Sequence, residues 1–128
     1  MKTQIVLLLL SFFSSVISLN AKSKMDVNSK EVSLMLQKDT KLIVLDVRTV
    51  EEFRDGHIKG ALNIDIRQPD ALAKIDKLDH NANYIVHCRT NHRSKIAVDH
   101  MIQSGFKSIY QMMDGFMGWS QNSLPIEK

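Results

Sequence analysis

The stretch that decides the fold is YIVHCRTNHRS, residues 84–94. Its first four residues form a short apolar run of the kind that becomes a buried strand. The only cysteine of the chain, Cys88, follows directly, and a polar run then leads into an amphipathic segment. We expect a helix to begin there, near Ser94. The stretch therefore predicts a strand, a tight loop and a helix amino terminus, with the thiol at the end of the strand.

Cys88 has the surroundings of a reactive thiol. Backbone N–H groups at a helix start have no partner within the helix and carry the positive end of its dipole, so a loop over them favours an anion. Arg89, His92 and Arg93 all lie within five residues of Cys88, and nearby cations lower the pKa of a thiol. The sequence thus nominates Cys88 as a nucleophile, against the alternative of an inert buried cysteine.

The loop CRTNHRS, set between a strand and a helix, resembles the active-site loop of the rhodanese (sulfurtransferase) family. Two further blocks resemble the same family, LDVRTVEEFRDGHIKGALNI at residues 45–64 and DGFMGWSQNSLPI at residues 114–126. The fourth loop position is often glycine in the family and is Asn91 here. Such a loop commonly needs a positive φ, which asparagine tolerates best among the other residues, so we expect a left-handed Asn91.

The resemblance implies sulfur transfer in two halves. The Cys88 thiolate would take the outer sulfur of a donor such as thiosulfate, and the resulting persulfide would pass it to cyanide or a thiol acceptor. The N–H groups of the loop would stabilise both anionic states. The residues implied for this loop are Arg89, Thr90, Asn91, His92, Arg93 and Ser94. No cofactor and no metal is implied.

Three of these loop side chains receive individual expectations. Arg89 and Arg93 would attract a doubly charged donor, and Arg93 also stands where the family often places a loop-closing arginine. His92 keeps three interpretations, because a histidine there could tune Cys88, shuttle a proton or point into water.

Strand and helix patterns alternate along the chain. Strands are expected at residues 25–27, 41–47, 61–66, 84–87 and 108–112, and helices at residues 28–37, 49–56, 69–78, 94–105 and 116–119. This order predicts an α/β fold with a mostly parallel central sheet of about five strands and helices on both faces. In such sheets ligands bind beyond the carboxyl ends of the strands. We therefore expect residues 46–49 and 113–117 to form the walls of a pocket around Cys88.

Capping and turn residues set the expected ends of the helices. Thr49 and Glu52 form a capping box at the start of one helix, and Gly56 is expected to end it in a left-handed turn. Gly105 is expected to close the helix that follows Cys88. Pro69 suits the first position of the helix before it.

Other candidate residues have simpler structural explanations. Asp46 and Arg48, close to Glu52, are expected to form a structural ion-pair network rather than a catalytic pair. The remaining histidines and methionines lack metal-ligand spacing, so we expect them to fill the core, bond loops or lie at the surface. They include His57, His80, His100, Met112, Met113 and Met117, the last three near Trp119.

Three other functions remain alternatives. Related phosphatases separate their cysteine and arginine by five residues, whereas four lie between Cys88 and Arg93. One residue less removes roughly 3.5 Å of contour, which disfavours a phosphatase or arsenate reductase. A non-catalytic binding or sensing module could use the same fold. Thiol redox chemistry would need a partner's thiol, since the chain has no CxxC and no second cysteine.

The first 21 residues differ from the rest of the chain. A basic start at Lys2 and the apolar residues 5–19 predict a secretory signal peptide cleaved after Ser18 or Ala21, with an uncleaved anchor as the alternative. Residues 22–128 would form one rhodanese-like domain, located in the periplasm or secreted. The net charge of +3 comes from scattered residues, so we expect neither nucleic-acid binding nor membrane attachment after cleavage. The sequence leaves the oligomeric state open.

Overall fold

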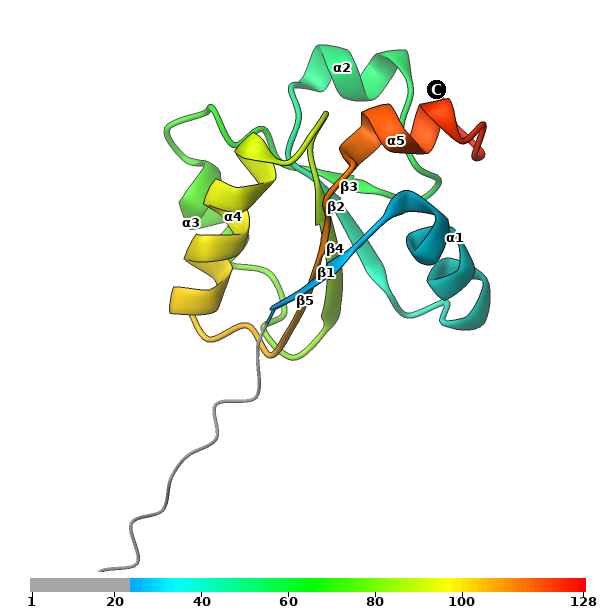
Figure 1. Cartoon of the computed structure of the whole chain (residues 1–128). Coiled ribbons are helices and arrows are strands. Elements are labelled where there is room, and N and C mark those ends of the chain that lie inside the picture. Colours follow the sequence, from blue (N-terminus) through cyan, green and yellow to red (C-terminus); the bar gives the residue numbers. More distant parts are fainter. Residues whose placement is uncertain (1–23) are drawn as a thin grey trace, which may run out of the picture.

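A five-stranded sheet forms the centre of the computed structural model, which describes residues 24–128 (Figure 1). The strands are β1 (Lys24–Val27), β2 (Ile43–Asp46), β3 (Leu62–Asn63), β4 (Asn83–His87) and β5 (Ser108–Met112). Their spatial order is β1-β5-β4-β2-β3, and every pairing is parallel. The predicted α/β class is confirmed. The signal peptide predicted at residues 1–21 lies outside the described residues.

Helices cover both faces of this sheet, as expected for parallel strands joined by crossovers. They are α1 (Ser29–Lys38), α2 (Val50–Asp55), α3 (Ala71–Asp76), α4 (His92–Gln103) and α5 (Gly115–Gln121). In Figure 1, α3 and α4 lie on one side of the sheet, α1 and α5 lie on the other, and α2 lies beyond the ends of the strands. Among residues 24–128, no helix combines the length and apolarity needed to cross a membrane.

Two hydrophobic cores, one on each face, hold these layers together. The core under α3 and α4 contains Cys88 and Val86 with Phe106 from the turn before β5, and the core under α1 and α5 contains Ile85 and Trp119. Neighbouring residues of β4 thus point to opposite faces, as the strand period of two requires. Cys88 continues this alternation and points to the α4 side.

The helix starts follow the capping signals in the sequence. Thr49 accepts the Glu52 N–H, and the Glu52 carboxylate accepts the Thr49 N–H, so the predicted capping box is present at α2. Asn28 and Glu31 form a second capping box at α1. Gly105 has a φ of +83°, the left-handed conformation expected where the chain leaves α4.

Several expectations about element ends were wrong. Gly56 is extended, with φ 160°, because the chain continues directly into a bridge between His57 and Glu127. Pro69 precedes α3 and is not its first residue, since the helix begins at Ala71 after the cap position. The third strand spans only Leu62–Asn63, because the following residues bond irregularly to the end of β2 and the loop beyond it.

Candidate active site

The loop between β4 and α4 lies at the carboxyl edge of the sheet, beside the starts of α2 and α5 (Figure 1). Helix α4 begins at His92, two residues before the expected Ser94, so the loop proper contains only four residues. Cys88 opens it, and the residue is 1% exposed. The thiol is therefore buried and forms almost no part of the molecular surface.

The carbonyl groups of the first loop residues are bound by the surrounding fold. The Phe116 N–H donates to the Cys88 oxygen at 2.8 Å, and the Met117 N–H donates to the Arg89 oxygen at 2.9 Å. The ring N–H at Nδ1 of His87 donates to the same Cys88 oxygen at 3.0 Å. Because the C=O and N–H of a trans peptide point in opposite directions, these bonds turn the next N–H groups toward the inside of the loop.

Gly115 makes this contact between the loop and α5 possible. Its φ of +60° is left-handed, and a Cβ there would collide with the carbonyl oxygens of Arg89 and Thr90. Only a glycine permits both the conformation and the close approach. The turn at Gly115 therefore seats the active-site loop against the start of α5.

The N–H groups of the same loop are left available. Within residues 24–128, no oxygen acceptor is found for the backbone N–H groups of residues 89–94. The last three of these residues, His92, Arg93 and Ser94, form the first turn of α4, where the N–H groups carry the positive end of the helix dipole. The loop thus offers free donors to an anion beside Cys88.

Asn91 does not take the left-handed conformation expected from its place in the loop. Its φ is −143°, and it is the N-cap residue of α4. Its side-chain Nδ2 donates to the Met113 oxygen at 3.2 Å, and its carbonyl oxygen accepts the Lys95 N–H at 3.1 Å. The loop is therefore held by side-chain and helical bonds, with no residue in a conformation that favours glycine.

Arg93 closes the loop onto α2. Its guanidinium donates to both carboxylate oxygens of Glu52, at 2.7 and 3.0 Å. These bonds are the main reason why the pKa of Glu52 falls from 4.5 to about 2 and that of Arg93 rises. The charge of Arg93 is therefore already paired with an acidic group of the protein. Of the two loop arginines, Arg89 is exposed and has no acidic partner within residues 24–128.

A buried ion pair lies beneath this closure. Arg48 donates to both oxygens of Asp46, with Nε at 3.0 Å from Oδ1 and Nη2 at 2.7 Å from Oδ2. Its Nη2 also donates to the Gly56 oxygen, and its guanidinium stacks 3.9 Å from the centre of the Phe116 ring. The structural ion pair predicted for Asp46 and Arg48 is confirmed, although Glu52 pairs with Arg93 instead of joining it.

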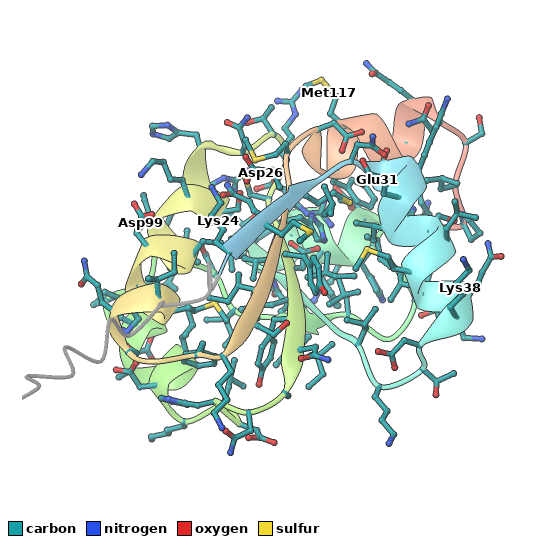
Figure 2. All side chains as sticks on the ribbon, turned by 60° about the horizontal axis from the view of Figure 1, so that its bottom comes forward. Lys24, Asp26, Glu31, Lys38, Asp99 and Met117 are labelled. Atoms are coloured by element: carbon teal, nitrogen blue, oxygen red, sulfur yellow. The ribbon has the colours of Figure 1, made fainter. Side chains whose placement is uncertain are left out.

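A hollow of about 390 Å³ adjoins the loop. Both segments expected to form walls contribute to it, through Arg48 on one side and through Phe116 and Met117 on the other, while Arg89 and Glu52 complete the rim. Met117 is 37% exposed, and its side chain lies at the outer surface in Figure 2. The lining also includes Asp55, so the hollow combines the apolar side chains of Phe116 and Met117 with charged groups of both signs.

His57 and His100 occupy the simple structural places expected of them, since His57 stacks on Phe53 and bonds its carbonyl oxygen and His100 pairs with Asp76. His92 and Thr90 are exposed, which leaves the three interpretations of His92 open. Met112 is buried in the core beside Trp119. Within residues 24–128, no group of histidine, cysteine or acidic side chains could hold a metal ion.

Two residues near the loop have roles that the sequence does not predict. The sequence places His87 only in a strand, yet its ring holds the Cys88 carbonyl. It also places Gln111 only in the last strand, yet this residue is buried and bonds the loop. The available signal was a polar side chain at a buried position near the carboxyl end of each strand.

Comparisons with known proteins agree with this geometry. The family model for the rhodanese-like domain matches residues 28–122. Thiosulfate sulfurtransferase 16 from the chloroplast of Arabidopsis thaliana is 33% identical over 91 residues, covering 63% of this chain and 76% of that protein. Thiosulfate sulfurtransferase GlpE of Stutzerimonas stutzeri is 35% identical over 78 residues, covering 60% and 69% respectively.

A solved structure supports the same assignment. The rhodanese-related protein of Thermoplasma volcanium has a TM-score of 0.67 at 28% identity, over 80% of this chain and 96% of that one. The chain spans only about half the length of some other curated relatives. Because the family model covers nearly all of the described residues and the similar proteins include named sulfurtransferases, the chain belongs to the rhodanese-like domain family, a family that includes sulfurtransferases.

Proposed function

We propose that this protein is a sulfurtransferase that carries sulfur as a persulfide on Cys88. One observation supports the proposal above all others. The carbonyl groups of Cys88 and Arg89 are bound to neighbouring groups, while the N–H groups of residues 89–94 have no oxygen acceptor within the described chain. A loop with this polarity stabilises negative charge at its centre, whether on a thiolate or on the outer sulfur of a persulfide.

Sulfur transfer then proceeds by two displacements at sulfur. In the first, the Cys88 thiolate forms a bond to the outer sulfur of thiosulfate, whose S–S bond breaks with its electron pair leaving on sulfite. In the second, cyanide or a thiolate acceptor bonds to the outer sulfur of the persulfide, and the Cys88 thiolate leaves. The two steps balance without any added oxidant or reductant, which fits a chain with a single cysteine.

The burial of Cys88 and the free charge of Arg89 favour a small anionic donor. A residue that is 1% exposed admits a compact reagent more readily than a bulky one. Arg89 is exposed at the rim of the hollow and pairs with no acidic group in residues 24–128. Its field would concentrate a dianion such as thiosulfate beside the loop.

The short loop also favours sulfur over phosphorus chemistry. Only four residues separate Cys88 from Arg93, and that arginine is bound to Glu52 at 2.7 Å, so it is not free to clamp a phosphate. Incubation with thiosulfate and cyanide, compared with an aryl phosphate, tests the distinction. We expect thiocyanate formation that disappears in Cys88→Ser and no phosphate release; phosphate release that depends on Cys88 would overturn the proposal.

We also propose that the domain works after export. The support comes from the sequence alone, through the basic start and apolar run of residues 1–21. Cell fractionation followed by sequencing of the mature amino terminus tests this, with cleavage after Ser18 or Ala21 as the expected result. Recovery of the intact chain in the cytoplasm would contradict it.

A further inference from the structure

Gln111 is a buried polar residue whose side-chain hydrogen bonds go to the active-site loop and to the first turn of α4. It lies on β5 and is 1% exposed. Its side-chain Nε2 donates to the Asn91 carbonyl oxygen at 3.2 Å and to the Ser94 hydroxyl oxygen at 3.0 Å. Ile109, two residues earlier, belongs to the core on the α4 side, and alternate residues of a strand share a face. Gln111 therefore replaces what would otherwise be an apolar core side chain directly beneath the loop.

The bonds of Gln111 converge on the last carbonyl before α4. The Asn91 oxygen also accepts the Ser94 hydroxyl at 3.1 Å and the Lys95 N–H at 3.1 Å. Because a trans peptide places its C=O and N–H in opposite directions, a carbonyl held toward β5 turns the next N–H, that of His92, away from β5. Gln111 thus holds the carbonyl of Asn91, the last in the loop, by a hydrogen bond, as the Phe116 N–H holds the carbonyl of Cys88, the first.

The position carries an energetic cost that packing alone does not explain. The Gln111 Oε1 atom is buried and has no hydrogen-bond partner within residues 24–128. An unpartnered buried acceptor destabilises the fold, whereas an apolar side chain of the same shape avoids that cost. The two hydrogen bonds from Nε2 to Asn91 and Ser94 offset the cost of burying the unpartnered Oε1.

We propose that Gln111 is a positioning residue for sulfur transfer, acting through the Asn91 peptide to keep the His92 N–H turned away from β5 and available to the anionic sulfur on Cys88. This inference rests on the proposed function of Cys88. It assigns a chemical role to a strand residue outside the loop. Its effect is expected on the ionisation of the thiol and on the persulfide, and not on the fold alone.

Gln111→Met tests the role, because methionine has nearly the same shape and lacks the amide donor. The readout is the rate of Cys88 alkylation by iodoacetamide as a function of pH, which reports the thiol pKa whether or not the protein transfers sulfur. We expect a raised thiol pKa and an alkylation rate at neutral pH about fivefold lower, because the thiolate is the reactive form. The matched control is Ile109→Val, a buried change on the same face of β5 that makes no hydrogen bond to the loop.

A second variant keeps the test decisive if Gln111→Met folds poorly. Ser94→Ala removes the hydroxyl that accepts from Gln111 and donates to Asn91. We expect it to raise the thiol pKa as well, and the double variant to do less than the sum of the two changes, because the groups act on one carbonyl. A thiol pKa unchanged in both single variants, or changed equally by Ile109→Val, would overturn the inference. If the wild type transfers no sulfur from thiosulfate but the variants still show the expected shifts in thiol pKa, the result would count against the proposed function and not against the role of Gln111.

Discussion

The Phe116 backbone N–H donates to the Cys88 carbonyl oxygen across 2.8 Å, and so joins the start of α5 to the residue proposed to carry sulfur. The bond fixes the plane of the peptide that follows Cys88 and turns the Arg89 N–H inward. The neighbouring bond from Met117 to Arg89 does the same one residue later. The direction of the loop N–H groups is thus set by α5, a helix that begins at Gly115, 27 residues after Cys88.

Gly115→Ala is expected to disrupt this seating. The new Cβ would collide with the Arg89 and Thr90 carbonyl oxygens, and an alanine at φ +60° is strained in addition. We expect a loss of more than about 2 kcal/mol in the free energy of unfolding, together with loss of sulfur transfer. Urea unfolding and the thiosulfate assay measure the two effects.

Gly105→Ala is the matched control for that change. Gly105 has a comparable φ of +83°, but a Cβ there would meet nothing within 4 Å. We expect the free energy of unfolding of this variant to fall by only about 1 kcal/mol, the cost of the left-handed backbone conformation, and its activity to be unchanged. Equal losses of activity in the two variants would show that the contact between Gly115 and the loop has no special role.

Arg93→Met is expected to weaken the protein in a pH-dependent way. The guanidinium holds the folded pKa of Glu52 at about 2, below its ordinary 4.5. A lowered folded pKa contributes stability above pH 4.5 that is lost as the pH falls toward 2. Since both side chains are partly solvated, we expect a contribution of only about 1 kcal/mol at pH 7.

Urea unfolding of the wild type and of Arg93→Met at pH 7 and at pH 3 measures this contribution. The difference between the two proteins should be larger at pH 7. Glu52→Gln provides the partner control, because it removes the charge while keeping a side chain that can complete the capping box. A difference that stays constant with pH would mean that the ion pair contributes nothing measurable.

Arg89→Met is expected to act on the encounter with the donor. The side chain is exposed and pairs with no acid in the described residues, so its removal should leave stability unchanged. We expect kcat/KM for thiosulfate to fall about tenfold at low salt, and the difference to shrink at high salt as the field is screened. Lys107→Met serves as the control, because it removes an exposed cation at the opposite, amino end of the strands, just before β5.

The buried ring of His87 gives the stability of the protein a second pH dependence. Burial lowers its pKa below the ordinary 6.5, because the loss of hydration destabilises the imidazolium more than its attraction to Asp46 stabilises it. The unfolded chain therefore binds the proton first, and stability should fall as the pH drops below about 6.5. We expect His87→Gln to flatten this part of the profile between pH 7 and pH 5. A profile of the same slope in both proteins would contradict the assignment.

The fold could be predicted because its signals are local. The apolar run of β4, the capping box at Thr49 and the left-handed turn at Gly105 each lie within a few neighbouring residues. The ends of elements that depend on distant contacts were missed. Gly56, for example, is extended because it leads into a bridge with Glu127, which no local pattern reveals.

The site could be predicted only in part, for the same reason. Cys88 and the sequence of its loop stand out in the chain, whereas the bonds that orient the loop come from Phe116, Met117 and Gln111. The pairing of Arg93 with Glu52 joins residues 41 positions apart. The pairing leaves Arg89 as the loop arginine proposed to attract the donor, a role that both arginines were expected to share.

The most direct test of the account is the intact mass of the purified protein after treatment with thiosulfate. If Cys88 carries sulfur, the mass should rise by about one sulfur atom, return to its original value on addition of cyanide, and stay constant in Cys88→Ser. The loop would then have held the persulfide long enough to be measured. An unchanged mass in the wild type, or an equal gain in Cys88→Ser, would contradict the assignment of Cys88 as the sulfur carrier.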